Sequence, residues 1–358
     1  MGSELYFKLN SFKHNISFFR IKGWKEKIKR LTLTSLVLGA VLLLGASKSF
    51  NSNGSKEDFI KWQENTRAYL SMVIFNLAPP PAVPLEASFG EKQSWQGYEI
   101  TRVQFQDRPG HITYGWLARP DKPGAEKIPA IIALHGHSGS ALMLFNPSDM
   151  YFYGDLFAKK GYIVLALDID HKYLEDVSPF ISFKPLPKNV KFPEVGQRVW
   201  MVKRGIDFLE TVPGVDKDQI AVMGLSNGSV SSMFAAAMEP RIKVVVASGS
   251  LIMSDRMWHS DLVHCRCQYL YKLDGVLDYY DIFALIAPRP LLIQNGEKDP
   301  IFPIDSAKEA FKFIQKAYEI DGAPENVAMD IHNGKHEFRA EAPEKWIEKY
   351  LPLPNTKK

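Results

Sequence analysis

The sequence predicts an α/β fold with a mostly parallel central sheet flanked by helices. Apolar strand-like runs alternate with amphipathic helical stretches from about residue 128 to the carboxyl end. The run at 128–134 is continuously apolar, which is typical of a strand buried on both faces of a parallel sheet. A serine between two glycines, at 224–228, lies between a short apolar strand and a helix of small residues. In such folds the loops at the strand carboxyl ends build the functional site.

The elements follow from the spacing of apolar residues along the chain. A helix over 59–77 is stopped by the proline-rich stretch 78–84, and a hairpin joins the alternating segments 98–105 and 112–118. We expect the remaining strands at 128–134, 161–168, 220–223, 241–248, 290–295 and 326–331, and the remaining helices at 151–160, 194–211, 305–319 and 344–351. Residues 171–193 are expected to form a loop.

Composition is that of an ordinary globular protein, with 46% hydrophobic and 23% charged residues among 358. The formal net charge is +4. Residues 1–30 carry eight Lys/Arg against two Glu, so they contribute +6 and the remainder is −2. The body therefore has no basic face, and no nucleic-acid partner is expected.

The amino-terminal region predicts export. A basic head, 1–30, precedes a segment at 31–47 whose first 16 residues are uncharged, between the lengths of a signal-peptide core and a bilayer span. The flanking positive charge keeps the head cytoplasmic and sends the rest outward, to a bacterial envelope. Cleavage as a signal peptide and retention as a membrane anchor both remain open. A linker and helix at 48–94 then lead to the main domain, 95–358.

That domain contains an irregular insert, 249–281, which we expect over the site. Its Trp258 and Tyr271 are candidates for facing an acyl or sugar group, although a plain packing role fits equally well. Cys265 and Cys267 are too far apart on an extended chain for an unstrained disulfide. With His264 a metal site is conceivable, but no second ligand pair has zinc-type spacing, so a structural loop with two thiols is expected and no metal.

The segment Gly224-Leu225-Ser226-Asn227-Gly228 fits the G-x-S-x-G nucleophile elbow. In this motif the serine lies on a strained turn from strand to helix, with its hydroxyl exposed. The turn brings the flanking backbone into such close contact that a Cβ atom would clash, hence the glycines. The pattern predicts Ser226 as a nucleophile.

A serine nucleophile needs a general base, and the base needs an anion to orient it. Asp299 follows the strand 290–295 and His336 follows the strand 326–331, so both come after Ser226 in the order serine, acid, histidine. Glu297 is the alternative acid and His332 the alternative base. The sequence predicts a Ser226, His336 and Asp299 triad.

An oxyanion hole completes such a site. It uses the backbone N–H of the residue after the serine, here Asn227, and a second N–H from an early strand-to-helix loop. The segment 135–139, with two glycines, has this position, and His137 is expected to donate the second N–H. His135 is expected to make structural hydrogen bonds within the loop.

These motifs resemble the α/β-hydrolase superfamily and, within it, the acetylxylan-esterase and dienelactone-hydrolase-like group. The resemblance spans roughly 95–350 and includes the two loops above, the segment 287–299, which begins Ala-Pro-Arg-Pro-Leu-Leu, and the segment 334–338. It implies the α/β-hydrolase fold, with Ser226 as nucleophile, Asp299 as acid and His336 as base. Dienelactone hydrolase carries cysteine at the elbow, so Ser226 argues against that substrate.

The sequence therefore predicts a serine hydrolase of carboxylic esters, without a cofactor. Its partner would be a small-molecule or carbohydrate ester, with acetyl esters of carbohydrate suggested by the resemblance, and the membrane if the segment 31–47 is retained. An exopeptidase-like hydrolase and a non-catalytic binding module with the same fold are the alternatives. Contact of His336 with both Ser226 and Asp299 would discriminate catalysis from binding.

Overall fold

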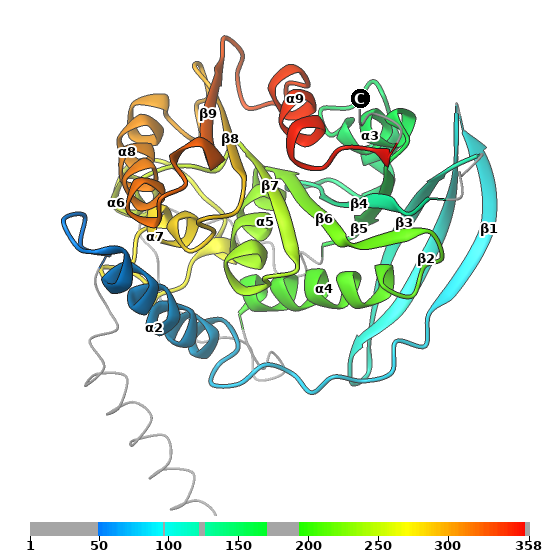
Figure 1. Cartoon of the computed structure of the whole chain (residues 1–358), viewed down its shortest axis with the longest axis horizontal. Helices are drawn as coiled ribbons and strands as arrows, with labels where there is room; N and C mark the ends of the chain where they lie inside the picture. The colour runs from blue at the N-terminus through cyan, green and yellow to red at the C-terminus, as the bar shows by residue number, and fades with distance from the viewer. Residues whose placement is uncertain (1–48, 96, 122–125, 170–192, 355–358) are drawn as a thin grey trace, which may run out of the picture. The chain divides into compact units, whose positions relative to one another are not determined.

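A computed structural model of the chain describes residues 49–95, 97–121, 126–169 and 193–354. Within these ranges the chain has the α/β-hydrolase fold, with a nine-stranded, mostly parallel sheet and helices on both faces (Figure 1). The described helices include none with the length and apolar character needed to cross a bilayer. The predicted leader 31–47 and most of the predicted loop 171–193 lie outside the described ranges.

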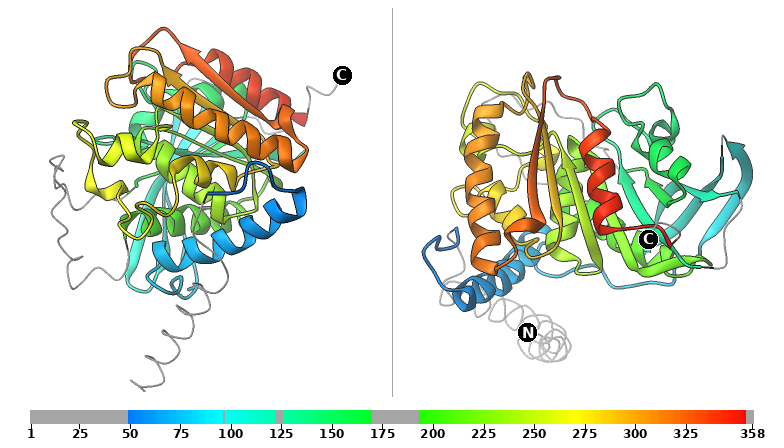
Figure 2. Two further views of the ribbon diagram at one scale, coloured as in Figure 1. Left: turned by 90° about the vertical axis from the view of Figure 1, so that its left-hand side faces the viewer. Right: turned by 45° about the horizontal axis from the view of Figure 1, so that its top comes forward.

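The strands are β1 (Ser88–Trp95), β2 (Tyr98–Arg108), β3 (His111–Pro120), β4 (Ile128–Leu134), β5 (Ile163–Leu167), β6 (Val215–Leu225), β7 (Ile242–Ser248), β8 (Leu291–Gly296) and β9 (Val327–His332). Their order across the sheet is β1-β2-β3-β5-β4-β6-β7-β8-β9. The first three pair antiparallel with their neighbours, and the pairs from β5 to β9 are all parallel. Figure 2 shows β1 and β2, in cyan, at one edge of the sheet.

The helices are α2 (Lys56–Ile74), α3 (Tyr153–Lys160), α4 (Glu194–Leu209), α5 (Asn227–Met238), α6 (Ser254–Trp258), α7 (Tyr279–Ala284), α8 (Ile304–Asp321) and α9 (Glu341–Tyr350), with short 3-10 turns at Ala141–Phe145, Arg266–Gln268 and Pro324–Asn326. The predicted strands and helices are confirmed, with ends that shift by a few residues. The predicted hairpin is β2 and β3, which pair through Gln106 and Ile112 near the turn.

Strand β4 shows why the sequence alternates as it does. All seven of its residues are buried. Ile132 and Leu134 belong to the core that packs against α4, α5 and α8, whereas Ile131 and Ala133 belong to the core beneath α3 and α9. Because side chains alternate across a strand, a strand covered on both faces must be apolar throughout. Figure 1 shows α3 and α9 on one face and α4 and α5 on the other.

Strand β1 corrects the sequence analysis, which assigned its residues to a linker. All eight of its residues are exposed, including Phe89 and Trp95. Without a buried face there is no apolar alternation to indicate a strand. The strand forms through backbone pairing with β2.

The domain begins earlier than its polar leading sequence suggests. Phe50 is buried, and its ring contacts Phe59 and Trp62 of α2. The Ser49 hydroxyl donates a hydrogen bond to Asp281 at the start of α7. Burial raises the pKa of Asp281 to about 7, and the bond from Ser49 opposes that rise. The stretch directly before α2 is therefore part of the folded body.

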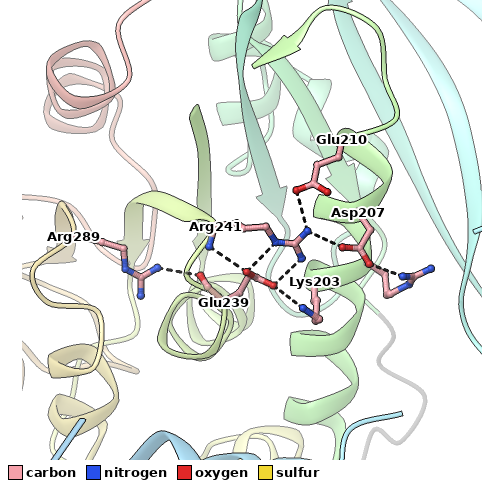
Figure 3. Close-up of polar contacts among 7 residues, drawn as sticks. Lys203, Asp207, Glu210, Glu239, Arg241 and Arg289 are labelled. Atoms are coloured by element: carbon pink, nitrogen blue, oxygen red, sulfur yellow. Dashed lines mark hydrogen bonds and ion pairs between the residues drawn. The ribbon is translucent and has the colours of Figure 1, made fainter. Parts of the chain in front are cut away.

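An ion-pair network ties α4 to the segment between α5 and β7 (Figure 3). The carboxylate of Glu239, only 4% exposed, accepts hydrogen bonds from Arg241 and Lys203. Arg241 also pairs with Asp207, in α4, and with Glu210, which directly follows that helix. Burial by itself would raise the pKa of Glu239, but the bonds from the two cations outweigh it and lower the pKa to about 2. The carboxylate is therefore charged and paired across the working pH range.

We predict that Glu239→Gln lowers the free energy of unfolding by about 3 kcal/mol at neutral pH, because the two cations lose a buried partner. The pKa of Glu239 in the folded protein lies below its ordinary value of 4.5. Its contribution is therefore complete above about pH 5 and is lost as the pH falls toward 2. Urea unfolding of both proteins, at pH 7 and at pH 3, measures this difference.

The matched control is Glu341→Gln, which breaks an exposed pair with Lys345. That change should leave the free energy of unfolding nearly unchanged at either pH, because water screens an exposed pair. A loss for Glu239→Gln that is no larger than the control's would contradict the structural role of the network.

Candidate active site

Ser226 lies at the sharp turn between β6 and α5. Its backbone angles are φ 60° and ψ −122°, a region that costs a non-glycine residue roughly 1–3 kcal/mol. Its N–H donates to the carbonyl of Ser248, which holds the turn against β7. Its side chain makes no capping hydrogen bond to α5, so the hydroxyl is not used by the helix. The strained turn that the motif predicts is present.

The two elbow glycines are required by close approach of the backbone. A Cβ atom at Gly224 would lie 2.3 Å from the carbonyl carbon of Gly228. A Cβ atom at Gly228 would lie 2.0 Å from the carbonyl oxygen of Leu134, at the end of β4. Both distances are far inside van der Waals contact, so the predicted reason for the glycines is confirmed.

Asp299 and His336 form a hydrogen-bonded pair. The His336 Nδ1–H donates to Asp299 Oδ2 at 2.7 Å, which leaves Nε2 available to accept a proton. The other oxygen, Asp299 Oδ1, accepts the backbone N–H groups of Ile301 and Phe302 at 2.8 and 3.0 Å. The Phe302 ring stacks on the imidazole. The carboxylate is thus buried, paired and aimed at one nitrogen of His336.

The alternative acid and base do not form such a pair. Glu297 follows the same strand but its side chain is exposed. His332 Nδ1 accepts the N–H of Gly334 in the turn after β9, and burial lowers the pKa of His332. Of the two candidate acids and the two candidate bases, Asp299 and His336 are the ones that are hydrogen-bonded to each other.

The loop after β7 borders both the elbow and His336. Ser248 accepts the Ser226 N–H, and a Cβ atom at Gly249 would lie 3.0 Å from Cε1 of His336. The hydrogen bonds of the described residues include none between the Ser226 hydroxyl and His336. The Asp299 half of the expected contact is present, and the Ser226 half is not. Hydrogen bonds between a nucleophile and its base often tighten only when substrate binds.

The loop after β4 contains both predicted histidines. His135 Nδ1–H donates to the Gly136 carbonyl, and His135 Nε2 accepts the N–H of Ile169. Both nitrogens are occupied, and burial lowers the pKa of His135. The expected structural role of His135 is therefore confirmed. The neighbouring carbonyl of His137 accepts the Tyr151 hydroxyl.

The insert brings His137 and Asn227 to one place. His137 Nε2 lies 3.2 Å from Cys267 Sγ, and Cys267 Sγ lies 3.8 Å from Asn227 Oδ1. Gln268 Nε2 also approaches Asn227 Oδ1, at 3.5 Å. The two residues expected to donate oxyanion N–H groups therefore share a neighbour from 249–281. The sequence analysis singled out Cys267 but did not pair it with either of them.

His264 is a buried neighbour of the site that the sequence analysis considered only as a metal ligand. It is 6% exposed, and burial lowers its pKa to about 4, so it is neutral above that pH. The His264 ring contacts the ring of Phe302, which also stacks on the imidazole of His336. A histidine just before a cysteine pair was the only signal for it in the sequence.

The two aromatic residues proposed to face substrate differ in exposure. Trp258 is 7% exposed and packs against Tyr269 and His264, which fits the packing role. Tyr271 is 62% exposed on the insert.

This arrangement suits acyl transfer. A serine on a strained turn, an oriented imidazole and backbone N–H groups near a helix amino end supply a nucleophile, a base and a place for developing negative charge. Among the described residues, the group of side chains suited to hold a metal is His137, Cys265 and Cys267, whose ligand atoms lie within 4.8 Å of one another.

Comparison with known proteins shows what the chain is similar to. It is 28% identical over 153 residues, 36% of its length and 37% of the relative's, to 4-O-methyl-glucuronoyl methylesterase 1 of Wolfiporia cocos. A solved structure from Bacteroides fragilis, described as a candidate acetyl xylan esterase, matches with a TM-score of 0.69 at 18% identity, covering 87% of this chain and 94% of its own. A glucuronoyl esterase from Solibacter usitatus matches with a TM-score of 0.63 at 13% identity, covering 82% and 93%.

No family model matches the chain. The alignment with the Wolfiporia cocos relative spans little more than a third of either protein. The structural matches extend over most of both chains, and at their level of identity they establish the fold.

Proposed function

We propose that this protein is a serine hydrolase that cleaves carboxylic esters. The observation that carries the proposal is the buried Asp299–His336 pair, which borders the same loop as the strained turn of Ser226. A packing role alone would not require a carboxylate with one oxygen on two backbone N–H groups and the other on an imidazole. The names of the relatives, which are esterases of carbohydrate, support the same reaction class.

The chemistry follows from the side chains. His336 Nε2 takes the proton as the Ser226 oxygen attacks the ester carbonyl, and Asp299 stabilises the resulting imidazolium. The N–H groups of His137 and Asn227 hold the oxyanion of the tetrahedral intermediate. His336 then protonates the leaving alcohol, and water, activated by the same histidine, hydrolyses the acyl-enzyme. The Ser226–His336 hydrogen bond forms when substrate closes the site.

Carbohydrate esters are the proposed substrate class. Acetyl esters fit the resemblance of the sequence and the match to a candidate acetyl xylan esterase. Methyl esters of glucuronate are the corresponding substrate named for the Wolfiporia cocos relative. The two differ in which side of the ester bears the sugar, so acetylated xylan and a glucuronate methyl ester separate them.

We also propose that the protein acts outside the cytoplasm. Eight basic residues before an uncharged segment of export length support this location. A fusion of residues 1–60 to alkaline phosphatase, which is active only after export, should be active in a bacterial host. A fusion that begins after residue 47 should be inactive, and equal activity of the two would contradict the proposal.

Ser226→Ala should abolish labelling by a fluorophosphonate probe and reduce kcat on a short-chain aryl ester by about 10⁴-fold or more, because the nucleophile is gone. Gel fluorescence and initial rates measure both effects on the purified full-length protein.

The matched control is Ser231→Ala, on the following helix α5, whose buried hydroxyl donates to the carbonyl of Asn227. It should label and turn over as the wild type does. A folded wild-type protein that neither labels nor hydrolyses any ester offered would favour the binding-module alternative. Undiminished turnover in Ser226→Ala would refute the assigned nucleophile.

The choice of acid has its own test. Asp299→Asn should lower kcat by about 10⁴-fold, because the amide cannot hold the His336 tautomer that accepts the serine proton. Glu297→Gln, two residues earlier and exposed, should change kcat by less than about 3-fold. Rates on the aryl ester, with circular dichroism to verify folding, compare the pair. A larger loss of kcat in Glu297→Gln than in Asp299→Asn would instead assign Glu297 as the acid.

A further inference from the structure

Three possible metal ligands from two distant segments meet beside residues 135–139, the loop expected to donate the second oxyanion N–H and named the oxyanion loop below. His137 comes from the loop after β4, whereas Cys265 and Cys267 come from the insert. The imidazole nitrogen and the two sulfurs all lie within 4.8 Å of one another, and His137 Nε2 and Cys267 Sγ are 3.2 Å apart. In a tetrahedral zinc site, metal–ligand bonds of about 2.0–2.3 Å put neighbouring ligand atoms about 3.5 Å apart. Small side-chain rotations therefore suffice to enclose an ion.

Hydrogen bonds from neighbouring residues hold the backbone at this place. The Tyr151 hydroxyl donates to the carbonyl of His137. Arg198, fully buried on α4, donates to the carbonyl of Cys267 at 2.7 Å. The Cys267 N–H also approaches Cys265 Sγ, at 3.5 Å. These bonds fix the backbone of His137 and Cys267, from which two of the three side chains extend.

The donor set selects the class of ion. Cys265 and Cys267 are not joined in a disulfide. Two sulfurs and one imidazole suit Zn²⁺ and its borderline-soft relatives, while Mg²⁺ and Ca²⁺ require oxygen ligands. Three protein ligands leave a fourth position for water or another small ligand.

We propose that His137, Cys265 and Cys267 bind one divalent ion of the zinc class, through Nε2 and the two sulfurs, and that the ion fastens the insert 249–281 to the oxyanion loop. On binding, each thiol gives its proton to solvent and keeps the electron pair that bonds the metal. The ion crosslinks two segments that are otherwise joined by weak sulfur contacts. This site is independent of whether Ser226 acts as a nucleophile.

Cobalt gives a direct readout. The full-length protein, reduced and freed of metal, should bind one equivalent of Co²⁺ and develop a thiolate-to-cobalt charge-transfer absorption. One equivalent of Zn²⁺ should abolish that absorption, and excess Mg²⁺ should leave it unchanged. Zn²⁺ should also raise the thermal unfolding midpoint, because a ligand that binds only the folded state stabilises it.

Cys265→Ser and Cys267→Ser should each weaken Co²⁺ binding by at least about 100-fold and remove the upward shift by Zn²⁺. The matched control is His259→Gln, in the same insert, whose imidazole pairs with Asp274 instead. That variant should bind as the wild type does. Ser226→Ala should also bind normally, so failure of the metal site and failure of the esterase proposal are separable.

The proposal is overturned if the wild type shows no charge-transfer absorption. It is also overturned if the double variant Cys265→Ser/Cys267→Ser responds to Zn²⁺ as the wild type does. The His137–Cys267 contact would then be a sulfur–imidazole hydrogen bond alone.

Discussion

The arrangement depends on one steric constraint, the contact between Gly228 and the carbonyl of Leu134. Strands β4 and β6 are neighbours in the sheet, and the first turn of α5 passes directly over the end of β4. A side chain at Gly228 would occupy the position of the Leu134 carbonyl oxygen, so the approach is possible only for glycine. Because β4 and β6 are parallel, the elbow and the oxyanion loop occupy the same end of the sheet, and the glycine lets them lie against each other. Ser226 and His137 are candidates for one site as a consequence.

The remaining parts come from strand ends further along the same edge. Strands β7 and β8 lie next to β6 in order, and all three are parallel. Their carboxyl ends therefore deliver Ser248 beside Ser226, and Asp299 one strand further on. The turn after β9 returns His336 against Gly249, and Phe302 supports the imidazole from its flat face. The acid–base pair is built by loops on a rigid sheet, as parallel sheets favour.

The insert 249–281 contributes buried polar groups around this site. It contributes a buried histidine, His264, and the thiol of Cys267, which contacts His137 and Asn227. A fully buried arginine from α4, Arg198, holds the insert backbone at the same residue. Buried polar contacts of this kind specify one position for the segment, because any other leaves a charge or donor without a partner.

The sequence alone determined the fold class, the strand and helix succession, and Ser226, Asp299 and His336 as candidates, because those features are local. A strand buried on both faces has to be apolar throughout, and an elbow has to carry glycines at two positions. Strand β1 was not predicted from the sequence, because an exposed edge strand has no alternation of apolar residues. Only the tertiary structure showed that Asp299, and not Glu297, is hydrogen-bonded to His336, and not to His332, since both members of each pair share a strand end. Only it joined His137 to Cys265 and Cys267, because contacts between residues about 130 positions apart depend on how the sheet brings loops together.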